Sequence, residues 1–198
     1  MKDNNIKLKA YLNNNKLMEN FAESIYFKMF KEINLPIDLD LSLKNLGVNN
    51  KNVKFSNIEL NDKKLEDEEL LGLINFINLK VSSFTNNKLS KYDENLVKAL
   101  IISNVVYNLL FINEIDVNNF NKEVFILKYE DLFEKYFRND KLNDEELFII
   151  NFSTIYLIPR KPFKEYSQLK YSSNKVLSSI FEVPEMVINY RKRLLEDN

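Results

Sequence analysis

The sequence contains neither cysteine nor histidine. Without cysteine, the chain can form no disulfide, can do no thiol chemistry and offers no thiolate to a metal. Without histidine, it lacks the usual general base near neutral pH and also the commonest zinc ligand. These two absences exclude many ordinary hydrolytic and zinc-dependent active sites, and we expect neither a metal nor a cofactor.

Long apolar runs are missing as well. No stretch of about 18 apolar residues is present, so we expect no membrane span. The first fifteen residues are polar and rich in asparagine, and they lack the apolar centre of a signal peptide. A formal net charge of −1 creates no global field that would attract nucleic acid or an anionic membrane. We therefore expect a cytoplasmic protein.

The remaining composition is that of a globular chain. Hydrophobic residues make up 45% and charged residues 29% of the 198 residues, which is too apolar for general disorder. A chain of this length buries a proper core, and one domain is the natural expectation. We predict a flexible lead-in over residues 1–15 and a single domain over residues 16–198.

Apolar spacing in the first half predicts helices followed by strands. Four apolar residues recur at the i, i+4 spacing of an amphipathic helix, namely Leu17, Phe21, Ile25 and Met29. This helix ends before Pro36, and a short helix that ends near Gly47 follows it. Apolar and polar residues then alternate over residues 53–60 and 73–84, which predicts strands of a small sheet.

The second half is predicted to be mainly helical. A helix of about five turns is expected from residue 93, because an acidic first turn precedes a long apolar stretch. We interpret residues 121–139 as a mixed segment with more helix than strand. A further helix with Asn143 or Asp144 as its cap ends at Pro159, and short helices complete the chain. The fold class is α+β.

Several stretches share their order and spacing with one known family. Glu146 precedes Pro159 by thirteen residues in "EELFIINFSTIYLIP", and "VLSSIFEVPEMVINYRKRL" carries an apolar helix pair. Upstream, "INLPIDLDLSLKNLGV" opens with a proline and a short helix that ends at a glycine. Together they resemble the motifs of the ImmA/IrrE family of zinc-dependent peptidases, from Leu17 to Leu195. The resemblance implies a mostly helical zincin-like domain with a small β-sheet and a helix-turn-helix-like pair at the C-terminus.

The resemblance also assigns the positions of an active site. The family's catalytic helix carries His-Glu-x-x-His, in which two histidines bind zinc and the glutamate acts as the general base. The motif aligns with "SNVVY", which puts Ser103 and Tyr107 at the histidines and Asn104 at the glutamate. Glu146 takes the place of the third ligand. A hydroxyl is a poor zinc ligand, a tyrosine with a pKa of about 10 is a reluctant one, and an amide is no base. The resemblance thus implies a pseudopeptidase without catalytic residues.

Two interpretations of these four positions stay open. In the first, Ser103, Asn104 and Tyr107 fill the core and bond to the backbone or to Glu146, because buried polar groups need partners. In the second, they line a ligand pocket that has been put to a new use. The role of Glu146 is open in the same way. Glu146 is either a residue that stabilises a helix N-terminus or a group that still binds something in the old cleft.

Two further sets of residues are candidate surfaces. Aromatic residues of the segment after residue 121 are too many for one helix face and predict a partner-binding patch; they are Phe125, Tyr129, Phe133, Tyr136 and Phe137. Basic residues near the C-terminus are candidates for nucleic-acid contact; they are Lys175, Arg191, Lys192 and Arg193. Because such charge runs are usually solvated faces, we expect no nucleic-acid partner.

The leading functional hypothesis is regulation by binding. Through the resemblance we expect a catalytically inactive protein that sequesters a protein partner, such as an XRE-type repressor, an antitoxin-like protein or a component of a defence system. One alternative is an inhibitor from a phage or mobile element that blocks a bacterial defence nuclease, as anti-CRISPR proteins do. Another is an enzyme that uses the remnant cleft without a metal, although a serine with no base beside it is a weak nucleophile.

Overall fold

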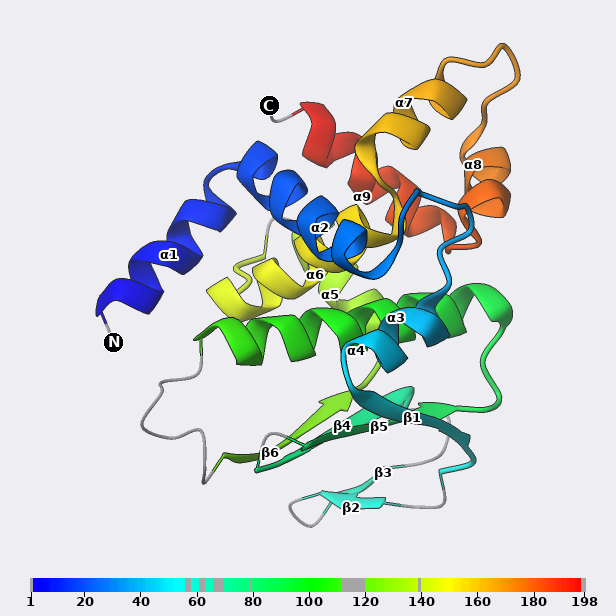
Figure 1. Ribbon diagram of the computed structural model, residues 1–198. Helices are drawn as coiled ribbons and strands as arrows, with labels where there is room; N and C mark the ends of the chain where they lie inside the picture. Colours follow the sequence, from blue (N-terminus) through cyan, green and yellow to red (C-terminus); the bar gives the residue numbers. More distant parts are fainter. Residues whose placement is uncertain are drawn as a thin grey trace.

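The computed structural model describes residues 2–55, 58–60, 63–65, 70–78, 80–111, 120–138 and 140–196. For residues 2–5, 58–60, 63–65 and 129–131, it describes the backbone alone. The architecture is mixed α+β and mostly helical, with helices stacked on one face of a small sheet (Figure 1). This confirms the predicted fold class at the level of α+β.

Three helices open the chain, and they are α1 (Lys2–Leu12), α2 (Asn15–Met29) and α3 (Leu39–Asn45). The lead-in was expected to be flexible, but most of it forms α1. This helix is attached to the core because Leu8 is buried and the Tyr11 ring lies 5.0 Å from that of Phe21. The predicted helices on either side of Pro36 are confirmed, and Gly47 follows α3 with a φ of +75°.

The main sheet has the strand order β1-β5-β4-β6. Its strands are β1 (Val48–Val53), β4 (Gly72–Ile77), β5 (Lys80–Asn86) and β6 (Asn121–Ile126). β1 pairs with β5 in parallel, and β4 pairs in antiparallel fashion with both β5 and β6. The predicted strand over residues 73–84 is therefore a hairpin of two strands. The prediction over residues 53–60 covers the end of β1 and all of β2 (Ile58–Leu60), while residues 56–57 lie outside the described part.

β2 pairs with β3 (Lys63–Leu65) in a separate two-stranded hairpin, which lies beyond the sheet on the side away from most of the helices (Figure 1).

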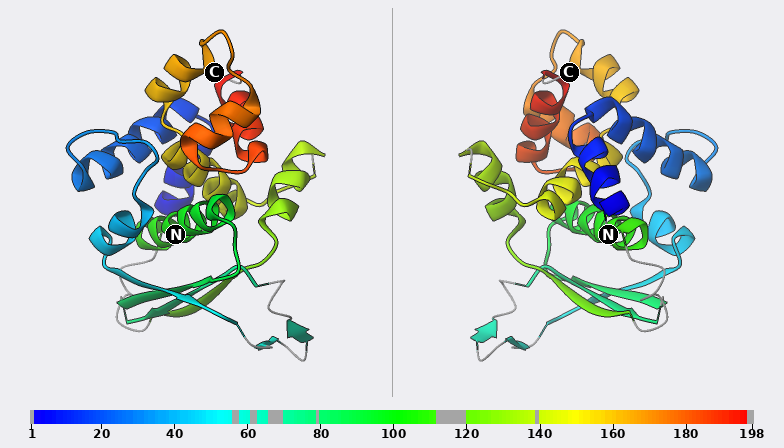
Figure 2. Two further views of the ribbon diagram at one scale, coloured as in Figure 1. Left: turned by 90° about the vertical axis from the view of Figure 1, so that its right-hand side faces the viewer. Right: turned by 90° about the vertical axis from the view of Figure 1, so that its left-hand side faces the viewer.

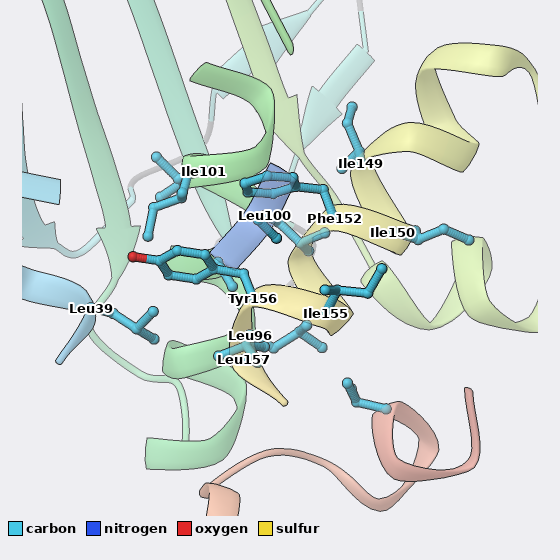
Figure 3. Close-up of a cluster of buried hydrophobic side chains, with 14 of the residues drawn as sticks. Leu39, Leu96, Leu100, Ile101, Ile149, Ile150, Phe152, Ile155, Tyr156 and Leu157 are labelled. Atoms are coloured by element: carbon cyan, nitrogen blue, oxygen red, sulfur yellow. The ribbon is translucent and has the colours of Figure 1, made fainter. Parts of the chain in front are cut away.

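The core lies between the sheet and two long helices, α4 (Lys91–Phe111) and α6 (Asp144–Leu157). α4 lies across one face of the sheet, and α6 packs on the other side of α4 (Figures 1 and 2). Leu100 and Ile101 of α4 meet Phe152 of α6 within one cluster of buried side chains (Figure 3). α6 begins with the predicted Asn143 cap.

Four shorter helices complete the fold, namely α5 (Tyr129–Phe137), α7 (Arg160–Ser167), α8 (Asn174–Phe181) and α9 (Glu185–Glu196). α8 and α9 pack against each other and are joined through Glu182, which adopts a left-handed conformation. Arg191 of α9 is fully buried, and its Nη1 lies 2.8 Å from Oε1 of Glu19 in α2. This ion pair joins the last helix to the N-terminal half of the chain.

The interpretation of residues 121–139 as a mixed segment with more helix than strand is confirmed, but its assignment of Phe125 to the helix is wrong. Residues 121–126 form strand β6, and helix starts only at Tyr129. The physical reason is visible in the burial pattern, because Lys122, Val124 and Ile126 turn to the helix-covered face while Glu123 is exposed. That alternation has the period of a strand. A short apolar run leaves strand and helix hard to distinguish, and pairing with β4 decides between them here.

Candidate functional site

Two of the predicted polar positions on α4, Ser103 and Asn104, are hydrogen-bonded back to their own helix. Ser103 Oγ donates to the Ala99 carbonyl at 2.8 Å, and Asn104 Nδ2 donates to the Leu100 carbonyl at 2.8 Å. Such bonds to the carbonyl four residues earlier let short polar side chains sit inside a buried helix. For Ser103, which has no exposed surface, this bond supports the interpretation as core filler.

Tyr107 lies among aromatic side chains, and its hydroxyl has no hydrogen-bonding partner among the described residues. Its ring centroid is 5.0 Å from that of Phe111 and 5.5 Å from that of Phe148. Burial raises the pKa of the Tyr107 hydroxyl, and the nearby negative charges of Glu145 and Asp144 raise this pKa further. Tyr107 therefore stays protonated at neutral pH, a state unsuited to a metal ligand or a base.

Glu146 serves as a helix cap. Its Oε2 accepts from the Asn143 backbone N–H at 2.9 Å, and the Asn143 side chain accepts from the Glu146 backbone N–H at 2.8 Å. This reciprocal arrangement is a capping box. The other carboxylate oxygen, Oε1, lies 3.6 Å from Lys135 Nζ. Both oxygens thus have a structural partner, as in the first of the two interpretations of this residue.

A cleft of about 290 Å³ opens between strand β6 and the helices above it. It is largely apolar, and its lining comes from α4, β6, α5 and α6 together with the connection between β6 and α5. The lining residues are Leu100, Asn104, Val124, Phe125, Ile126, Leu127, Lys128, Leu132, Glu146 and Ile149. Two of the four predicted positions, Asn104 and Glu146, therefore meet at one cavity.

The other two predicted positions do not line this cleft. Leu100 and Asn104, spaced four residues apart, form the cleft-facing side of α4. Ser103 and Tyr107 have the same spacing on a neighbouring side of the helix, and Tyr107 contacts Phe148 there. The structure thus places Asn104 and Glu146 at one cleft and keeps Ser103 and Tyr107 away from it. Within the described part of the chain, no group of three acidic side chains is placed to hold a metal ion.

Asn104 has a spare hydrogen-bonding atom at the cleft. The residue is 4% exposed, and its amide nitrogen is used by the Leu100 carbonyl. Its Oδ1 accepts no hydrogen bond from any residue that the structure describes. This oxygen is not among the fully buried polar atoms of the described residues, so it keeps contact with solvent at the cleft and can exchange that contact for a hydrogen bond to a ligand. Asn104 Oδ1 is therefore a natural acceptor for an N–H group of a molecule bound in the cleft.

Strand β6 supplies a second set of unused backbone groups. Among the described strands it is an edge, with β4 on one side only. In an antiparallel pair, the backbone groups of alternate residues point to the neighbouring strand. The hydrogen bond from Asn78 N to Phe120 O sets this alternation, so the backbone N–H and C=O groups of Lys122, Val124 and Ile126 point to β4. The N–H and C=O groups of Glu123 and Phe125 then point outward. An extended segment can pair with such an edge.

Asn108 and its partners were missed from the sequence. Asn108 Oδ1 accepts from Lys122 Nζ at 3.0 Å, and the same Nζ lies 3.2 Å from Glu145 Oε1. This cluster joins α4, β6 and α6. The i, i+4 spacing of Asn104 and Asn108 was a signal that both lie on one side of the helix. The contribution of β6 could not be found without the fold.

The predicted aromatic patch is mostly packed inside the protein. Phe133 is fully buried, so it is not available to a partner in this structure, and its ring meets that of Tyr190 at 5.4 Å. Tyr136 and Phe137 are half-buried against the same tyrosine. Phe125, on β6, lines the cleft. The structure describes the backbone of Tyr129 but not its side chain.

The four basic candidates do not form one exposed surface. Arg191 is buried with Glu19, which contradicts a role in nucleic-acid contact. Lys192 Nζ donates to Asn174 Oδ1 at 2.6 Å, and the Arg193 guanidinium stacks 4.7 Å from the centre of the Phe137 ring. Lys175 alone of the four lies exposed without a described partner.

No model of a known protein family, no curated protein and no solved structure matches this chain. Among the described residues, no helix is long and apolar enough to span a membrane.

Proposed function

We propose that this chain is a catalytically inactive protein of the ImmA/IrrE type that acts by binding a protein partner in the cleft between β6 and α4. The partner would be an XRE-type repressor, an antitoxin-like protein or a component of a defence system in the cytoplasm. Binding would sequester the partner by occupancy, and no bond would be broken.

The observation that carries the proposal is Asn104 Oδ1, an acceptor that has no donor among the described residues and lies at a cleft bordered by an edge strand. An extended segment that pairs with the outward backbone of β6 would bring N–H groups toward this side of α4. Its apolar side chains would contact Leu100, Leu132 and Ile149. Burial of such side chains supplies much of the affinity in recognition of this kind.

The residues of the site also argue for binding rather than chemistry. Both oxygens of Glu146 have partners, and Tyr107 is kept protonated by its burial and its acidic neighbours. Asn104 carries an amide where the family has its general base. Among the described residues of the lining, Lys128 alone is cationic, and it would favour a segment that carries an acidic residue at one end.

Peptides selected from a displayed library for binding to the whole chain test the proposal. We expect Leu127→Asp, at the end of the cleft, to weaken the best peptide at least tenfold. The near-isosteric Asn104→Leu should weaken it about fivefold, the value of one hydrogen bond of about 1 kcal/mol. Leu109→Asp is the matched control, since Leu109 (47% exposed) and Leu127 (42% exposed) are similarly accessible but Leu109 lies outside the cleft.

Mass spectrometry of the peptide after long incubation checks the absence of catalysis. An intact peptide whose affinity depends on Leu127 and Asn104 supports the proposal. A cleaved peptide would show an active enzyme, and affinity that falls equally in the Leu109 control would place binding elsewhere.

A further inference from the structure

Exposed hydrophobic side chains gather at one end of the molecule. Four of them lie in the segment that runs from the last turn of α7 to the first turn of α8. This segment, residues 166–176, is called here the α7–α8 tip. Their exposed fractions are 37% for Tyr166, 57% for Leu169, 81% for Tyr171 and 42% for Val176. Such side chains scattered singly need no explanation, but a cluster of them marks an interaction surface.

The α7–α8 tip is also basic. Two exposed lysines lie in the tip, Lys170 and Lys175, and two more, Lys161 and Lys164, lie just before it on α7. None of them forms an ion pair with a residue that the structure describes. Glu165 is the single acidic residue between Pro159 and Phe181. The chain as a whole carries a net charge of −1. The positive charge of these lysines still acts on a nearby surface, because salt screens mainly the interactions between charges more than about 10 Å apart.

The position of the tip limits what can reach it. In all three views the loop between α7 and α8 projects from the end of the molecule opposite the sheet (Figures 1 and 2). A projecting loop can touch a flat surface without obstruction from the rest of the fold. The tip is also far from strand β6, so a contact there leaves the cleft accessible.

We propose that the α7–α8 tip binds the surface of an anionic lipid bilayer. Leu169 and Val176 would enter the boundary between headgroups and acyl chains, and the tyrosines would lie at the headgroup level, where this residue is enriched. The four lysines would lie against the anionic headgroups. The chain would thus be a peripheral protein that holds its partner-binding cleft away from the membrane.

Nucleic acid accounts for fewer of these residues. Stacked bases would use Tyr166 and Tyr171, but they would leave the exposed Leu169 and Val176 unexplained. Single strands are also usually held in a groove, whereas this segment projects. The basic residues of α9 do not extend the surface, since Arg191 is buried and Arg193 lies over Phe137.

Co-sedimentation of the full chain with vesicles tests the proposal. One set of vesicles contains phosphatidylcholine alone, and in the other about a third of the lipid is phosphatidylserine. We expect binding to the anionic vesicles and little to the neutral ones. Lys170→Gln with Lys175→Gln should reduce it about 25-fold, or about fivefold for each lysine. Leu169→Ser with Tyr171→Ser should reduce it at least tenfold.

Phe27→Ser is the control, because Phe27 is 52% exposed on α2 and outside the tip. It should bind the anionic vesicles as the wild type does. The proposal is overturned if the wild type does not prefer anionic vesicles, or if the control loses as much binding as the tip variants. Tighter binding to a labelled oligothymidine, lost in the same tip variants, would assign the surface to nucleic acid instead. None of these outcomes affects the cleft, whose peptide test is separate.

Discussion

Two buried charged residues, Glu19 and Arg191, join helices from opposite ends of the chain. Glu19 is 3% exposed and lies between two arginines, with its Oε2 at 2.8 Å from Arg160 Nη1 and its Oε1 at 2.8 Å from Arg191 Nη1. Arg191 Nε also donates to the Ile158 carbonyl at 2.9 Å. Buried ions are tolerated only where such partners offset the loss of hydration. Arg191, a candidate for nucleic-acid contact in the sequence, is therefore a structural element of the core.

Removal of the carboxylate from this network should be costly. We expect Glu19→Ala to lower the free energy of unfolding by about 3–5 kcal/mol, because it leaves the Arg191 charge buried without its partner. The double variant Glu19→Leu, Arg191→Met should recover most of this loss. Urea denaturation measures both, with the exposed Glu165→Gln as the control. A loss below about 1 kcal/mol for Glu19→Ala, typical of exposed pairs, would mean that the network is open to water.

Tyr156 makes stability depend on pH in the alkaline range. Its hydroxyl donates to Ser42 Oγ at 2.9 Å, and burial raises the pKa of Tyr156 to about 12. Between about pH 10, the pKa of an exposed tyrosine, and pH 12, the folded state binds the proton more tightly than the unfolded state. Stability should therefore fall as the pH rises through this window.

Tyr156→Phe isolates this effect. The variant should lose about 1 kcal/mol at neutral pH through the missing hydrogen bond. From about pH 10 upward, its stability should fall less steeply than that of the wild type, because phenylalanine does not titrate. Urea denaturation over the alkaline range measures the two slopes. Parallel slopes would show that Tyr156 is not the group responsible.

At the scale of elements, helix α6 sets the position of the candidate site. It begins at the capping box of Asn143 and Glu146, and its buried face packs on α4. The cap was predictable because an asparagine precedes an acidic first turn. Strand β6 was not predicted, since a short apolar run next to aromatic residues fits either element. Pairing with β4 is what makes this stretch a strand.

The cap makes a measurable contribution to stability. Asn143→Ala should lower the free energy of unfolding by about 1 kcal/mol, because the Glu146 backbone N–H loses its acceptor, Asn143 Oδ1. Asn20→Ala is the matched control. Asn20 lies exposed inside α2, where alanine is the better helix former, so this change should be neutral or slightly stabilising. Equal effects at both positions in thermal or urea denaturation would contradict the assigned role of Asn143.

At the scale of the whole molecule, the sequence predicted more of the fold than of the site. Periodicity and caps identified most helices and the extended character of residues 73–84, because these depend on neighbouring residues, but they did not show that this stretch folds back as two strands. The cleft depends on β6, α4 and α6, which lie far apart in the sequence, so its lining could not be assigned. The burial of Arg191 and of Phe133 could not be predicted either, because Arg191 packs with Glu19 and Phe133 with Tyr190, both far away in the sequence. Family membership stays a prediction, since it rests on motifs in which three aligned groups have been replaced.

Amide hydrogen exchange of the chain, with and without a selected cleft peptide, tests the central claim most directly. Pairing along β6 predicts slower exchange at the outward amides of Glu123 and Phe125, by at least tenfold when the chain is saturated with peptide. The amides of strand β1, at the other edge of the sheet, should be unchanged. Unaltered exchange at both β6 amides, with protection at β1 or at the α7–α8 tip instead, would contradict the proposed binding site.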